Sequence, residues 1–135
     1  METKIKRNIQ WIEGEKSGKN KKHKYSGIHF LAEFWNGRII DDAEKIREIL
    51  VEAVKRANNT PLEFVVHKFH PQGVTGIVLL AESHISIHTW PEFNYVALDI
   101  YTCGDKSLPL KALEYLKSEF QPKRFEISKI KRGKV

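Results

Sequence analysis

The 135-residue chain is long enough for one domain with a single hydrophobic core. Apolar residues make up 41% of it, the share of an ordinary globular protein, which excludes a wholly disordered chain. No apolar run approaches the roughly 20 residues of a membrane span, so we expect no membrane partner. The single cysteine, Cys103, cannot form an internal disulfide, and without an export signal we expect a cytoplasmic location.

The net charge of +6 is concentrated at the N-terminus. Residues 1–25 hold eight of the 23 lysines and arginines but only three of the 17 acidic residues, leaving 15 and 14 for the rest. We therefore interpret residues 1–26 as a basic, disordered extension and residues 27–135 as the folded domain. A basic tail can contact phosphates, so a non-enzymatic nucleic-acid-binding protein is one alternative; the nearly neutral domain argues against nucleic acid as a partner.

Hydrophobic periodicity predicts six strands and two helices. The strands are expected at residues 28–35, 62–69, 74–83, 84–90, 95–102 and 123–130. One helix follows cap candidates Asp41 and Asp42, and the second follows a cap at Ser107. The order β-α-β-β-β-β-α-β predicts an α+β fold, a two-layer sandwich with two helices on one face of a mostly antiparallel sheet. A second subunit could cover the other face.

The segment AESHISIHTWPE, residues 81–92, gathers side chains that occur in catalytic and metal sites. On a strand, His84 and His88 lie about 13 Å apart, too far to share one zinc ion, so we predict no metal. Five positions separate Ser83 from His88, so on a straight strand their side chains point to opposite faces, and the sequence around Ser83 has no G-x-S-x-G elbow. A hydrolase pair therefore requires a sharp bend beside Ser83. Purely structural roles, including a buried Cys103, remain open on these grounds.

The run GVTGIVLLAESHISIHTWPEFNYVALDIYTCG, residues 73–104, resembles the signature of prokaryotic S-adenosylmethionine decarboxylases. These are pyruvoyl-dependent enzymes of polyamine and spermidine biosynthesis. The similarity extends from residue 27 to about residue 133 and includes the GxH start at 27–29 and the KAxEYLK helix at 111–117.

The resemblance implies that Ser83 is consumed to make the cofactor. Its hydroxyl would attack the Glu82 carbonyl and form an ester, from which His88 would take the alpha proton. Elimination and loss of ammonia would leave chains 1–82 and 83–135, the second headed by a pyruvoyl group. That group would form a Schiff base with the substrate amine and act as an electron sink. Cys103, in the family's TCG, is implied as the proton donor in decarboxylation, which suits a thiol because thiols are mostly protonated at neutral pH.

The same resemblance implies the substrate-binding residues. Phe69 falls where the family stacks an aromatic ring on adenine, Glu92 matches a ribose-binding carboxylate, and Trp90 lies between His88 and Glu92 in the sequence. Thr75 stands where the family commonly has a serine whose hydroxyl assists processing; its extra methyl restricts the rotamer, so we expect slower but surviving cleavage.

We also expect a homodimer of cleaved protomers, because the small protomer is about half the size needed to enclose a nucleoside. A pyruvoyl-dependent arginine decarboxylase on the same scaffold is the main alternative, since a carboxylate would also suit a guanidinium group. The second helix opens LPLKA (residues 108–112) where close relatives have DPWKA, which affects local packing more than chemistry.

Overall fold

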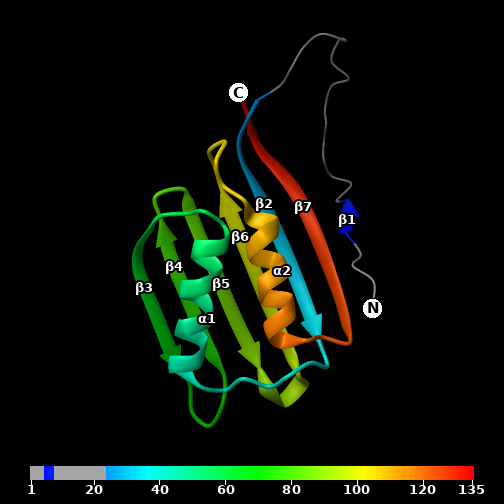
Figure 1. The fold of residues 1–135 in the computed structure, drawn as a ribbon. Helices are drawn as coiled ribbons and strands as arrows, with labels where there is room; N and C mark the ends of the chain where they lie inside the picture. Colours follow the sequence, from blue (N-terminus) through cyan, green and yellow to red (C-terminus); the bar gives the residue numbers. More distant parts are fainter. Residues whose placement is uncertain (1–4, 8–23) are drawn as a thin grey trace.

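The computed structural model describes residues 5–7 and 24–135. Six strands form an antiparallel sheet: β2 (Tyr25–Trp35), β3 (Pro61–Lys68), β4 (Val74–Leu80), β5 (Ser83–Trp90), β6 (Tyr95–Thr102) and β7 (Arg124–Lys134). A short strand, β1 (Ile5–Arg7), pairs in parallel with β7, giving the order β1-β7-β2-β6-β5-β4-β3. Helices α1 (Ala43–Arg56) and α2 (Pro109–Phe120) lie side by side on one face of this sheet (Figure 1). The two-layer α+β prediction is confirmed.

The sheet begins earlier in the chain than expected. β2 starts at Tyr25, which pairs with Lys134 at the end of a β7 that runs past the expected residue 130. Residues 25 and 26 therefore belong to the sheet, and Ile5–Arg7 add a strand to its edge. The other residues assigned to a disordered extension, 1–4 and 8–23, lie outside the described residues.

The two helices begin in different ways. Asp42 caps α1 as predicted, because its carboxylate accepts the Glu44 backbone N–H at 2.9 Å. The predicted cap at Ser107 is wrong: α2 starts at Pro109, whose fixed φ suits a first helical position, and Leu108 precedes it without a side-chain cap. The Ser107 hydroxyl instead accepts a hydrogen bond from the Asn59 amide at 3.0 Å. Among the described residues, no helix has the length and apolarity to cross a membrane.

Strand alternation gives the sheet two different faces. The helices cover one face, where Ile85 and Ile87 of β5 are fully buried. Gly76 allows α1 to approach closely, since a Cβ there would lie 2.7 Å from a Leu50 methyl carbon. Helices leave the opposite face open, and large apolar side chains on β3 and β4 are exposed there: Val65, Ile77 and Leu79.

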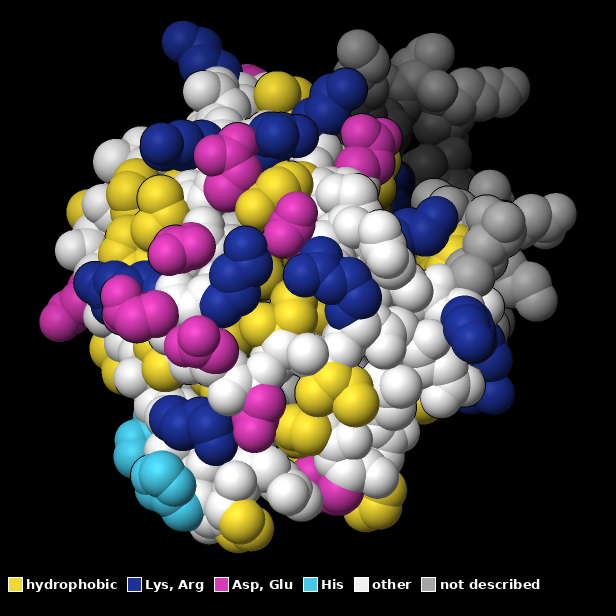
Figure 2. All heavy atoms as spheres, turned by 60° about the horizontal axis from the view of Figure 1, so that its bottom comes forward, with side chains coloured by type: hydrophobic (Ala, Val, Ile, Leu, Met, Phe, Trp, Pro, Cys, Tyr) yellow, Lys and Arg dark blue, Asp and Glu magenta, His cyan; other side chains and the backbone are white. Residues whose placement is uncertain are grey.

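The end of the molecule that carries the β3–β4 loop comes forward in Figure 2. Acidic and basic side chains are interspersed on this face, with apolar side chains between them. This mixture agrees with the nearly neutral charge of the chain beyond residue 25.

Candidate active site

The bond between Glu82 and Ser83 lies at a sharp turn. β4 ends at Leu80 and β5 begins at its register partner Ser83, so Ala81 and Glu82 alone connect the two strands. The predicted strand over 74–83 is therefore wrong at its end. Ser83 has a backbone φ of +131°, a region that residues other than glycine rarely adopt. Such a conformation costs about 1–3 kcal/mol and persists only where surrounding contacts hold it.

Hydrogen bonds to Thr60, just before β3, hold the Glu82 side of this turn. The Glu82 carboxylate accepts the Thr60 backbone N–H at 2.9 Å and the Thr60 hydroxyl at 3.2 Å. The backbone N–H of Ala81 donates to the Thr60 carbonyl at 2.9 Å. The residue just before β3 thus fixes both turn residues.

Cys103 lies directly beside the same turn, just after β6. Thr102 is the register partner of Ser83, and the Cys103 backbone N–H donates to the Glu82 carbonyl oxygen at 3.0 Å. This donor polarises the carbonyl and favours negative charge on its oxygen. The Cys103 side chain is exposed rather than buried, and it borders an open hollow of about 220 Å³ that Gly27 and Thr102 also line.

Thr75 and His88 meet at the other end of β5. They are register partners on β4 and β5, and the Thr75 hydroxyl lies 3.1 Å from His88 Nδ1, within hydrogen-bonding distance. The structure therefore brings together the two residues that the sequence resemblance assigns to processing. Their contact uses the hydroxyl that threonine shares with serine.

The residues expected to bind substrate lie at this second end as well. The Trp90 ring lies 6.2 Å from the His88 ring and stacks on Tyr95 at 5.3 Å, while Glu92 is in the short helix η1 (Pro91–Phe93). Phe69 follows β3, where its ring is 47% exposed and lies 4.5 Å from the His67 ring. The exposed Phe69 and Trp90 rings are available for stacking.

One chain does not bring Ser83 and His88 together. They are the first and sixth residues of β5, and at about 3.3 Å per residue they lie roughly 16 Å apart. Figure 1 shows the two ends: the β4–β5 turn is at the top of the sheet, and the β3–β4 loop and η1 are at the bottom. In one chain, the expected site residues therefore form two separate groups, one at each end of β5.

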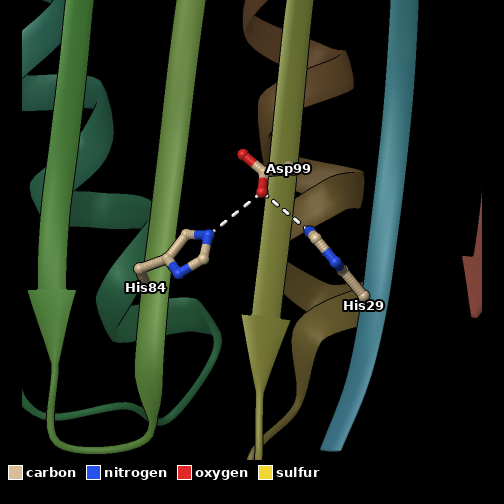
Figure 3. Close-up of side chains that lie close together, drawn as sticks. All are labelled: His29, His84 and Asp99. Atoms are coloured by element: carbon tan, nitrogen blue, oxygen red, sulfur yellow. Dashed lines mark hydrogen bonds and ion pairs between the residues drawn. The ribbon is translucent and has the colours of Figure 1, made fainter. Parts of the chain in front are cut away.

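A polar cluster on the open face was not predicted. His29, His84 and Asp99 come from β2, β5 and β6, and one ligand-type atom of each lies within 4.8 Å of those of the other two (Figure 3). Alternation indicates which face each residue occupies, but only the register between strands places the three side chains beside one another.

Comparisons with known proteins agree on one family. A family model described as S-adenosylmethionine decarboxylase matches residues 28–133. The S-adenosylmethionine decarboxylase proenzyme of Pyrococcus abyssi is 49% identical over 109 residues, covering 79% of this chain and 78% of the relative. That of Persephonella marina is 47% identical over 111 residues, covering 81% of this chain and 84% of the relative.

A solved structure gives the same answer. The crystal structure of the adenosylmethionine decarboxylase from Aquifex aeolicus matches with a TM-score of 0.78 and 46% sequence identity. The match covers 83% of this chain and 94% of that chain. The chain therefore belongs to the S-adenosylmethionine decarboxylase family.

Proposed function

We propose that this protein is a self-processing, pyruvoyl-dependent decarboxylase of S-adenosylmethionine. Its product would be the aminopropyl donor of spermidine and other polyamine synthesis, and we expect it to act in the cytoplasm, where the Cys103 thiol stays reduced. Family membership supports the substrate. The observation that supports the chemistry lies at the β4–β5 turn. Ser83 has a strained backbone there, and the Cys103 N–H polarises the Glu82 carbonyl that the Ser83 hydroxyl would attack.

Self-cleavage uses this arrangement directly. The Ser83 oxygen adds to the Glu82 carbonyl carbon, the C–N bond breaks, and an ester replaces the peptide. The Cys103 backbone N–H holds the oxygen that becomes negative during this addition. His88 then removes the alpha proton, Glu82 leaves as a carboxylate, and the resulting enamine takes up one water and releases ammonia. The residues at the turn thus fit a pyruvoyl group built from Ser83.

Decarboxylation then requires an electron sink and one proton. Formed from Ser83, a pyruvoyl group would supply that sink for the electrons that remain when carbon dioxide leaves. Cys103 has an exposed thiol beside the same turn, where it can return the proton to the alpha carbon. Phe69 and Trp90 would stack on the adenine, and Glu92 would accept hydrogen bonds from the ribose hydroxyls.

Each complete site would need two copies of the chain. Because Ser83 and His88 lie roughly 16 Å apart on one strand, His88 does not reach the Ser83 of its own chain. A second copy packed antiparallel on the open face would bring its His88 and Thr75 to the end of the sheet that carries Ser83. That face also exposes Val65, Ile77 and Leu79, apolar side chains that such packing would bury. We therefore expect a homodimer with two shared sites.

The intact mass of the purified protein tests the proposal. Under denaturing, reducing conditions, cleavage should yield chains 1–82 and 83–135, and the second should begin with a keto-acid rather than an amine. Ser83→Ala should remain a single chain of 15.7 kDa. The cleaved enzyme should release carbon dioxide from S-adenosylmethionine but not from arginine. Release from arginine alone would contradict the assigned substrate, and an uncleaved wild-type chain would contradict the proposed cofactor.

A further inference from the structure

The cluster around Asp99 has no role in the reaction described so far. Asp99 Oδ2 lies 2.7 Å from His29 Nε2 and 3.0 Å from His84 Nε2 (Figure 3). The other carboxylate oxygen, Oδ1, accepts a hydrogen bond from the Ser86 hydroxyl. Three strands are thereby linked through one carboxylate on the open face of the sheet.

The directions of these bonds favour a hydrogen-bond network over a metal site. Arg132 Nη1 lies 3.3 Å from His29 Nδ1, and because a guanidinium group only donates, Nδ1 must be the acceptor. The His29 proton then resides on Nε2, which points at Asp99. A histidine that binds a metal usually has the opposite pattern, with its second nitrogen donating to an acceptor.

Asp99 is strongly held in its ionised form. Burial alone would raise the pKa of this carboxyl, but the hydrogen bonds from His29, Ser86 and His84 outweigh burial and hold the pKa well below its usual range. The charged carboxylate is therefore a stable anchor for the three donors.

The network ends beside the bond that is cleaved. His84 directly follows Ser83, so the Asp99 carboxylate holds the chain on the C-terminal side of the strained residue. On the N-terminal side, Thr60 and the Cys103 backbone hold Glu82. A strained backbone persists only where contacts on both sides define it.

We infer that Asp99 is a positioning residue for self-cleavage, which through His84 holds Ser83 in the conformation that starts the acyl shift. This inference rests on the proposed cleavage between Glu82 and Ser83. Removing the anchor lets the turn relax to an unstrained peptide, so it slows formation of the ester. It leaves the later elimination, which depends on His88, unaffected.

The test follows the rate of chain cleavage in freshly made precursor. Asp99→Asn and His84→Leu should each slow cleavage by about tenfold or more. His84→Gln, which keeps an N–H donor near the position of Nε2, should cleave close to the wild-type rate. Val54→Ala, a cavity variant in α1 away from the open face, controls for lost stability and should cleave normally once folded.

Hydroxylamine separates positioning from a general structural effect, because it cleaves esters but not ordinary peptide bonds. It should release chain 1–82 from His88→Ala, which stops at the ester, but not from Asp99→Asn or His84→Leu. Release from these two variants at the His88→Ala rate would overturn the inference, as would normal cleavage of either one. Stoichiometric zinc in the wild-type protein, whose removal by chelation stops cleavage, would also overturn it. An uncleaved wild type would instead refute the proposed function.

Discussion

If each cleavage site combines Ser83 of one copy with His88 of another, two variants that do not self-cleave alone should regain cleavage when they form a mixed dimer. Ser83→Ala lacks the attacking hydroxyl, and His88→Ala lacks the base, so each should remain a single chain when made alone. In a mixed dimer, one site joins the intact Ser83 of the His88→Ala chain to the intact His88 of the Ser83→Ala chain. The second site lacks both residues.

The expected extent of cleavage follows from this geometry. Proton transfer requires about 3 Å between the reacting groups, whereas β5 holds Ser83 and His88 of one chain roughly 16 Å apart. Random pairing of equal amounts in a two-fold dimer would place about half of the His88→Ala chains beside a Ser83→Ala partner. About half of the His88→Ala chains, and none of the Ser83→Ala chains, should therefore be cleaved.

The assay co-expresses the two variants with different affinity tags, isolates the doubly tagged dimers and measures the mass of every chain. Tandem purification should raise cleavage of the His88→Ala chain from about half towards completion. Doubly tagged dimers in which neither chain is cleaved would refute the shared site. Cleavage of His88→Ala made alone, at the wild-type rate, would show that His88 is not the base.

Substitutions at four further positions test single residues. Cys103→Ala keeps the backbone N–H that contacts Glu82, so it should self-cleave normally while carbon dioxide release falls by about 100-fold or more. Thr75→Val removes the hydroxyl that contacts His88 and should slow self-cleavage by about tenfold, whereas Thr75→Ser should cleave at least as fast as wild type, with cleavage followed by intact mass. Phe69→Ala should raise KM for S-adenosylmethionine by roughly tenfold with little change in kcat, as stacking implies. Burial and the neighbouring Glu33 carboxylate raise the pKa of Tyr95, so stability should decline as pH rises above about 10, and urea unfolding of Tyr95→Phe should show a smaller decline than wild type.

The main features of the fold could be predicted because the sequence follows simple periods. Alternating residues in YVALDIYT correctly indicate β6, and apolar spacing after Asp42 correctly indicates α1. The expected strand bounds place the β4–β5 turn after Ser83 instead of at Ala81 and Glu82, because these two are not turn-forming residues and apolar residues continue from Ile77 to Ala81. Only the register, which pairs Leu80 with Ser83, locates this turn.

The sequence suggests a set of candidate residues but not their arrangement in space. The alternation of side chains along β5 correctly indicates that Ser83 and His88 of one chain do not meet. It does not show that Thr75 faces His88, or that Asp99 joins His29 to His84, because each contact depends on strand pairing. Long-range pairing of this kind is set by the whole sheet and turns rather than by any local run.

The length of β5 then explains how so small a chain can support this chemistry. The strand carries Ser83 at its first position and Trp90 at its last, so in the proposed dimer one rigid element would supply residues to two different sites. In an antiparallel pair of copies, the two sites must lie about as far apart as the two ends of this strand. At about 3.3 Å per residue that is about 23 Å, enough for each site to take its own nucleoside. The second copy of the proposed dimer would thus supply the enclosure that one two-layer chain lacks, and self-cleavage would depend on assembly.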